Sequence, residues 1–151
     1  MRPGTQDPAA CAGFAVAAGR ARTSPARYAA LAAERDRLED GLIEALVGRM
    51  REPPLRNGTA PRAPHVSNLS WPGWRGEEMC AALDLEGVAV SSGSACSAGT
   101  SEVSPVLRAM LGEARAASAV RVSLGEETTP EDVDQALRRW AVVMGRSARL
   151  P

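Results

Sequence analysis

The residue with the clearest chemical potential is Cys96, which lies in a run of small side chains from Ser91 to Ser101, S-S-G-S-A-C-S-A-G-T-S. No large apolar residue in this run could anchor it in a core, and its two glycines predict a loop with conformational freedom. A packing cysteine sits among large apolar neighbours, whereas an attacking cysteine must be exposed and able to form a thiolate. Composition alone therefore leaves two interpretations of Cys96 open, a reactive nucleophile and an exposed thiol without a role.

Two other polar residues, Asn68 and Arg121, lie in segments whose apolar residues alternate with period two, as in a half-buried strand. From residue type and place alone, Arg121 is a surface arginine on a strand, and Asn68 is a polar residue near a turn. Neither residue type by itself assigns a function.

The remaining cysteines are predicted to be packed thiols, because Cys11 and Cys80 lie in helical segments among alanine, methionine and leucine. Three cysteines are an odd number, and no C-x-x-C spacing is present, so a disulfide framework is not expected. The single histidine, His65, has no cysteine at zinc-ligand spacing. We therefore predict no metal site.

The elements that must position these residues follow from hydrophobic spacing and from caps. Two helices are predicted first, over residues 8–22 with Asp7 as N-cap and over residues 25–50, whose charged side chains are expected to form a solvated face. The shorter segments that follow are a strand near Leu55, a strand over 65–71, a helix over 76–85, a strand over 88–90 and a loop over 91–103. After these come a short helix capped by Ser104 and running from Pro105 through Met110, a strand over 119–124 and a last helix capped by Thr129. Short strands joined by helices predict a small α/β (α+β) domain, with two N-terminal helices, then β-α-β-α-β-α, and helices covering one face of the sheet.

The composition excludes several functions. The 151 residues carry zero formal net charge, and no basic run interleaves with aromatic residues, so a nucleic-acid partner is not expected. The longest uncharged stretch near the start, residues 8–19, is well short of the ~20 residues that span a bilayer, so we expect a soluble protein without a membrane partner. Because no disulfide framework is expected, reduced thiols in the cytoplasm are the default location. All 18 basic residues are arginine. Because arginine stays protonated, the chain cannot form a Schiff base from its own side chains.

Several ordered motifs resemble the cysteine desulfurases, in the branch of the class V aminotransferases that includes the nitrogen-fixation and general iron–sulfur-cluster enzymes. The loop S-S-G-S-A-C-S around Cys96 is similar to the active-site loop of that family. The other segments that resemble the family are R-P-G-T at 2–5, N-L-S-W-P-G at 68–73 with G-E-E at 76–78, V-R-V-S-L-G at 120–125, and T-T-P-E-D-V-D at 128–134. The resemblance covers nearly the whole chain.

The resemblance implies a chemistry for individual residues. The family uses pyridoxal 5'-phosphate to convert L-cysteine to L-alanine, and it keeps the sulfur as a persulfide on the loop cysteine, which Cys96 matches. Arg121 matches the arginine that binds the substrate carboxylate, and Asn68 lies in a motif near the substrate. Thr5 matches the threonine that reaches the cofactor phosphate of the partner subunit, which implies a homodimer. A sulfur-acceptor or iron–sulfur scaffold protein is the implied further partner.

The resemblance also places the chain at the C-terminal end of a fold-type I enzyme. Residues 1–24 would be the end of the large domain and a linking helix, and residues 25–151 the small domain with the cysteine loop. The family's cofactor lysine is missing, as the absence of any lysine shows, and Glu102-Val103-Ser104-Pro105-Val106-Leu107 lacks the histidine of the usual E-P-S-H-V-L segment. The chain is therefore expected to be inactive alone.

Two alternatives stay open beside the desulfurase. A stand-alone sulfur-relay or scaffold-binding module would accept sulfur on Cys96 without cofactor chemistry. A truncated product without a function is the other alternative, in line with a thin core of 28 alanines and five aromatic residues. A selenocysteine lyase also fits the loop, which does not separate sulfur from selenium.

Overall fold

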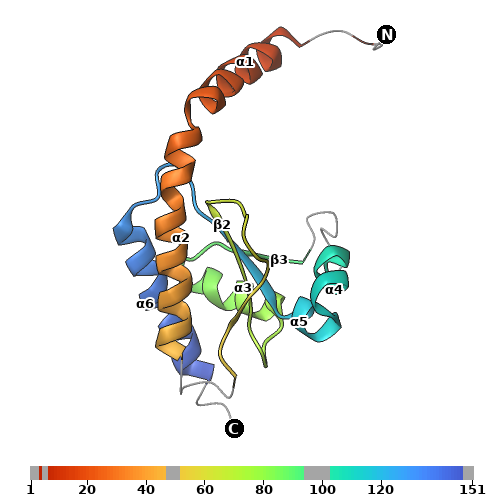
Figure 1. The fold of residues 1–151 in the computed structure, drawn as a ribbon, viewed down its shortest axis with the longest axis vertical. Helices are drawn as coiled ribbons and strands as arrows, with labels where there is room; N and C mark the ends of the chain where they lie inside the picture. Colours follow the sequence, from red (N-terminus) through yellow and green to blue (C-terminus); the bar gives the residue numbers. More distant parts are fainter. Residues whose placement is uncertain (1–3, 5–6, 47–51, 94–102, 148–151) are drawn as a thin grey trace.

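The computed structural model describes residues 4, 7–46, 52–93 and 103–147. The chain begins with helix α1 (Pro8–Thr23), which projects from the rest of the molecule (Figure 1). As predicted, Asp7 is its N-cap, and the Asp7 carboxylate accepts hydrogen bonds from the backbone N–H groups of Ala9 and Ala10, both at 3.0 Å. None of the residues in α1 is buried. The prediction that Cys11 is packed is therefore wrong, because this thiol is exposed on a helix that no other described element covers.

Helix α2 (Pro25–Leu46) follows after Ser24, whose hydroxyl donates to the carbonyl of Arg20 at 2.9 Å and so closes the end of α1. The predicted helix reached residue 50, but residues 47–51 lie outside the described residues. Leu31, Leu38 and Leu42 are buried along one side of α2. This spacing of seven and four residues places them on one face, as a helix that packs on a core requires.

The sheet has four antiparallel strands in the order β1-β2-β4-β3, formed by β1 (Leu55–Arg56), β2 (Val66–Ser70), β4 (Ala119–Ser123) and β3 (Ser91–Ser92). The strand predicted over 88–90 is wrong, since the pairing with β4 falls on Ser91 and Ser92. The physical reason is that the backbone N–H of Val88 donates to the carbonyl of Leu83 at 2.9 Å and so closes the preceding helix. The chain joins the sheet only after this turn.

The other helices are α3 (Gly76–Leu85), α4 (Pro105–Leu111), α5 (Glu113–Ala117) and α6 (Pro130–Ser147). The predicted caps of α4 and α6 are confirmed, because the hydroxyls of Ser104 and Thr129 accept from backbone N–H groups three residues later. Helix α5 was not predicted. Gly112, at φ +81°, ends α4 and starts this second short helix, and five residues are too few for an apolar period to show.

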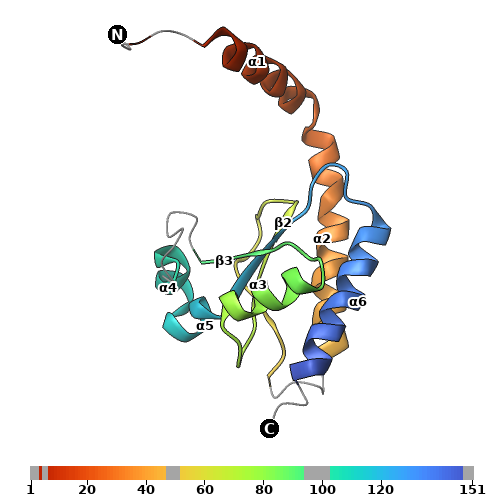
Figure 2. The ribbon, with the colours of Figure 1, turned by 180° about the vertical axis from the view of Figure 1, so that it is seen from behind.

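The core lies between one face of the sheet and helices α2, α3 and α6 (Figures 1 and 2). Leu69, Val120 and Val122 point from the sheet toward these helices, and the rings of Trp71 and Trp140 stack with their centroids 5.0 Å apart. The predicted small α/β domain with helices on one face of its sheet is confirmed. Within the described residues, no helix combines the length and the apolarity that crossing a membrane requires.

Candidate functional site

Arg121 occupies the middle of the sheet, with a neighbour in register on each side. It pairs with Asn68 on β2 and with Ser91 on β3. Side chains of directly opposed residues in antiparallel strands lie on the same face. Because Val120 and Val122 face the core, Arg121, Asn68 and Ser91 share the opposite face, which α2, α3 and α6 do not cover. The structure thus brings together two of the predicted site residues.

The guanidinium of Arg121 is a cation without a counter-ion in the described part of the chain. The side chain is exposed, and no described residue forms a hydrogen bond or an ion pair with it. A guanidinium presents parallel N–H donors that match a carboxylate or phosphate. Arg121 is therefore free to bind an anionic ligand over the open face of the sheet.

Asn68 is held by Asn57, which comes directly after β1. The Asn57 side-chain N–H₂ donates to Asn68 Oδ1 and to Ser70 Oγ, both at 2.7 Å. Arg115 of α5 donates from Nε to Asn57 Oδ1 at 2.9 Å. In the sequence, Asn57 is followed by Gly58, a pair that is typical of a loop and gives no sign of a role in the sheet. The network appears only when the strands pair.

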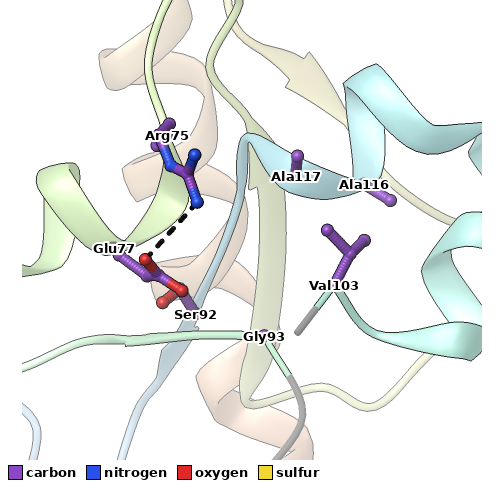
Figure 3. Close-up of a pocket in the computed structure, with 7 residues that line it drawn as sticks. All are labelled: Arg75, Glu77, Ser92, Gly93, Val103, Ala116 and Ala117. Atoms are coloured by element: carbon purple, nitrogen blue, oxygen red, sulfur yellow. Dashed lines mark ion pairs between the residues drawn. The ribbon is translucent and has the colours of Figure 1, made fainter. Parts of the chain in front are cut away.

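The stem of the cysteine loop borders a small cavity of about 30 Å³. Figure 3 shows Ser92 and Gly93 on one side of it and Val103 on the other, so the two described ends of the loop approach each other. Cys96 itself lies in residues 94–102, outside the described residues, as does Thr5. Arg75 and Glu77 complete the rim as an ion pair with 3.8 Å between nitrogen and oxygen (Figure 3).

Cys80 lies on α3 near the same stem and is half-buried. Burial raises the pKa of its thiol, and a hydrogen bond with Ser92 only partly opposes this effect. A thiol with a raised pKa is mostly protonated near neutral pH and is a poor nucleophile. Cys80 is therefore a structural thiol, in line with its sequence interpretation.

The segment that carries Asn57 binds to α2 through the buried carboxylate of Glu39. Glu39, fully buried, accepts from Arg62 at 2.6 Å through both terminal nitrogens and from Arg56 Nε at 2.9 Å. Arg35, also buried, donates to the carbonyl of Ala63 at 2.7 Å. The prediction of a solvated charged face on this helix is thus wrong at Glu39 and Arg35, because arginines from the following segment fold back onto it.

A larger cavity of about 490 Å³ lies beyond the end of β2. Trp74, Leu55 and Pro72 supply its apolar wall, and Arg115 and Ser70 supply polar groups. Trp74 is thus a pocket wall, and Trp71 is a core residue.

Comparison with known proteins supplies an independent view of the chain. A family model described as aminotransferase class-V matches residues 1–136. A cysteine desulfurase of Gluconacetobacter diazotrophicus is 38% identical over 141 residues, which cover 90% of this chain and 34% of that protein. The cysteine desulfurase NifS of Azotobacter vinelandii is 34% identical over 139 residues, which cover 91% of this chain and 34% of that protein.

The solved structures give the same picture for the fold. A NifS-like protein superposes with a TM-score of 0.79 and 25% sequence identity, over 97% of this chain and 36% of the other. Across all the curated relatives considered, this chain spans from 22% to 39% of their length. The similarity is therefore to one part of longer proteins.

Proposed function

The chain belongs to the class-V aminotransferase family, and on this premise we propose that it is the C-terminal part of a cysteine desulfurase. The proposed reaction converts L-cysteine to L-alanine and holds the sulfur as a persulfide on Cys96. The observation that carries the proposal is the open face of the sheet, where Arg121 has no counter-ion among the described residues and β3, its neighbour, leads into the Cys96 loop.

The chemical step assigned to this chain is a transfer of one sulfur atom. The thiolate of Cys96 attacks the substrate sulfur, an S–S bond forms, and the bond between that sulfur and the β-carbon breaks. The electron pair of the broken bond stays with the carbon, which takes up a proton, and the products are L-alanine and the Cys96 persulfide. Cys96 follows Ser92 by four residues, which span at most ~14 Å of extended chain, so the thiol is tethered to the strand beside Arg121.

Arg121 and Asn68 are proposed to hold the substrate. The Arg121 guanidinium would bind the carboxylate through two parallel hydrogen bonds, and the Asn68 amide beside it would add a further donor. Anchoring the carboxylate fixes the direction of the rest of the amino acid. This orientation is what a nucleophile from a neighbouring loop needs for attack.

The cofactor of this reaction would be pyridoxal 5'-phosphate, which acts as an electron sink when bound. The residues of this chain do not fit its covalent attachment, because none of its side chains is a lysine amine. The lysine must then come from outside these 151 residues, and we expect the chain to be inactive alone. Thr5 is proposed to reach the cofactor phosphate of a partner subunit, in a homodimer.

The division of the chain follows from the same proposal. Residues 1–24 would be the end of the large domain and a linking helix, in line with an α1 that buries none of its residues, and residues 25–151 would be the small domain. Reading the DNA frame upstream of the Met1 codon tests this division. An open frame into a lysine-bearing domain supports it, and a stop codon immediately upstream contradicts it.

The setting of the activity is also a proposal. We place the enzyme in the cytoplasm, with a sulfur-acceptor or iron–sulfur scaffold protein as its partner. The relatives named above are cysteine desulfurases, which supports delivery of sulfur to such a protein.

A chimera tests the proposed reaction directly. In the Azotobacter vinelandii enzyme, this chain replaces the matching segment, which is 34% of that protein, so that the remaining part supplies the cofactor lysine. We expect the chimera to form alanine from L-cysteine, and the Cys96→Ser variant to lose this activity. The Cys80→Ser variant is the matched control and is expected to retain it. Normal alanine and sulfide production by Cys96→Ser would contradict the assignment.

The lack of lysine favours a second candidate, a sulfur-relay module that accepts sulfur from another protein. The 151-residue chain would then gain a persulfide on Cys96 from a protein persulfide donor without any cofactor. Mass spectrometry after incubation with such a donor separates the two candidates. No added sulfur on Cys96 would remove the relay.

A further inference from the structure

We propose that Arg115 and Asn57 act as positioning residues that fix the direction of the Asn68 amide, so that Asn68 presents N–H donors beside the guanidinium of Arg121. The Asn68 amide and the Arg121 guanidinium then both offer donors to a carboxylate on the open face of the sheet. This inference rests on the proposed function, which makes that face the carboxylate site. It adds a reason why the site selects an anion.

The direction of the amide follows from the chemistry of Arg115. An arginine side chain has donors and no acceptor. Because Arg115 Nε donates to Asn57 at 2.9 Å, the atom that receives this bond must be the oxygen Oδ1. The Asn57 N–H₂ group is then directed at β2, where Asn68 must receive it with its own oxygen, at 2.7 Å.

Ser70 fixes the same direction independently. Its hydroxyl donates its single proton to the carbonyl of Arg115 at 2.8 Å, so toward Asn57 it can only accept. The Asn57 atom that faces Ser70 at 2.7 Å is therefore the nitrogen as well. Two separate hydrogen bonds thus require the same orientation of one buried amide.

The network is rigid enough to fix the orientation of the Asn68 amide. Asn57 is only 6% exposed, and its backbone N–H also donates to the carbonyl of Asn68 at 2.9 Å. Arg115 is held by a second bond, from Nη2 to the carbonyl of Arg56 at 2.5 Å. A buried polar group that lost one of these partners would bear the full free-energy cost of its desolvation.

The consequence appears at Asn68. With Oδ1 engaged by Asn57, the Asn68 N–H₂ group has no partner in the described part of the chain. It lies on the face where Arg121 is the register neighbour of Asn68. The reverse orientation would place an oxygen beside the bound carboxylate and repel it.

The chain offers a sharp test, because Asn57 and Asn68 are its only asparagines. The 151-residue chain is labelled with ¹⁵N-asparagine, and hydrogen exchange of the two side-chain amides is measured by NMR. We expect slow exchange for the Asn57 amide protons and fast exchange for those of Asn68. The opposite pattern in the wild-type chain would overturn the proposal without any variant.

The isosteric variant Asn57→Asp reverses the direction. A carboxylate still accepts from Arg115 but cannot donate to Asn68, so the Asn68 amide is expected to turn and donate to it. Exchange of the Asn68 amide protons should slow by about tenfold or more, which is the effect of a hydrogen bond to a charged group. Unchanged exchange at Asn68 in a folded Asn57→Asp chain would overturn the proposal. Arg115→Lys, which again has only donors, is the matched control and should keep the wild-type pattern.

A titration with sodium acetate separates this inference from the proposed function. We expect acetate to shift the Asn68 amide signals of the wild-type chain and to leave those of Asn57→Asp in place. Exchange that follows the expected pattern, with no acetate shift, would contradict the carboxylate site while supporting the positioning network. An acetate shift of equal size in both chains would overturn the positioning role.

Discussion

Glu39→Gln is the perturbation whose effect the structure determines most fully. The Glu39 carboxylate is fully buried and accepts three hydrogen bonds, two from Arg62 at 2.6 Å and one from Arg56 at 2.9 Å. Both arginines belong to the segment that also carries Asn57. The variant keeps the shape of the side chain but removes its charge, so that it tests the ion pairs and not the packing.

The magnitude follows from the exposure of the partners. Breaking a buried ion pair costs about 3–5 kcal/mol, and each hydrogen bond to a charged group contributes roughly 1.5–3 kcal/mol. The side chains of Arg62 and Arg56 are 23% and 40% exposed, so water solvates them when Glu39 loses its charge. We therefore expect Glu39→Gln to lower the free energy of unfolding by about 3 kcal/mol, the lower end of the range for a buried ion pair. At roughly 2–4 °C for each kcal/mol in a protein of this size, Tm should fall by ~6–12 °C.

The loss should also depend on pH. Burial alone would raise the pKa of Glu39, but the Arg62 guanidinium, then the Ser67 hydroxyl and the Arg56 guanidinium, interact with the carboxylate, outweigh burial and lower the pKa below its ordinary value of 4.5. A lowered pKa in the folded state gives stability that is complete above the unfolded pKa and is lost as the pH falls through the folded pKa. The difference between wild type and Glu39→Gln should therefore shrink as the pH falls below 4.5.

The assay is urea unfolding of the 151-residue chain, followed by circular dichroism over a range of pH. Asp40→Asn is the matched control, because Asp40 also pairs with Arg56 but is 59% exposed, and an exposed pair contributes less than ~1 kcal/mol. A Glu39→Gln effect as small as that of Asp40→Asn would refute the reasoning. So would a difference from wild type that stays constant with pH.

Three further changes test other parts of the account. In Gly76→Ala, the new Cβ would lie 2.6 Å from the carbonyl oxygen of Ala119. Urea unfolding should therefore show that the free energy of unfolding falls by about 1–3 kcal/mol, and an unchanged urea midpoint would contradict the close approach. Trp140→Ala removes a ring that is 1% exposed and stacked on Trp71. Calorimetry should show that the free energy of unfolding falls by about 3–5 kcal/mol, whereas a fall of less than ~1 kcal/mol would argue against this core. In the chimera, Arg121→Gln should raise KM for L-cysteine roughly 30-fold or more through loss of the carboxylate pair, and a normal KM would contradict the role of Arg121.

Much of the fold could be predicted because local signals decide it. Asp7, Ser104 and Thr129 are residues that cap helices, and each of them caps the helix that follows it. Residues 76–85 and 119–123 form the predicted helix and strand within a residue. Local spacing failed at 88–90, where the valines pack beside the core while the backbone closes α3 and pairs only at Ser91 and Ser92.

The candidate site was predictable only where a motif marks it. Arg121 and Asn68 were identified through the segments that resemble the desulfurases, and the register of β2 with β4 brings them together. The network of Asn57, Arg115 and Ser70 escaped the sequence analysis, because its members are far apart in the chain and meet only through tertiary pairing. Cys96 and Thr5 stay predictions, since both lie outside the described residues.

The most direct measurement of the central claim locates the transferred sulfur. The chimera is incubated with L-cysteine, alkylated without reductant and cleaved after glutamate, which releases residues 87–102 with Cys96 as their only cysteine, separate from Cys80. We expect this peptide to carry the mass of one additional sulfur atom, and we expect the Cys80 peptide, the internal control, to carry none. An unmodified 87–102 peptide from a chimera that forms alanine would contradict the claim that Cys96 receives the sulfur.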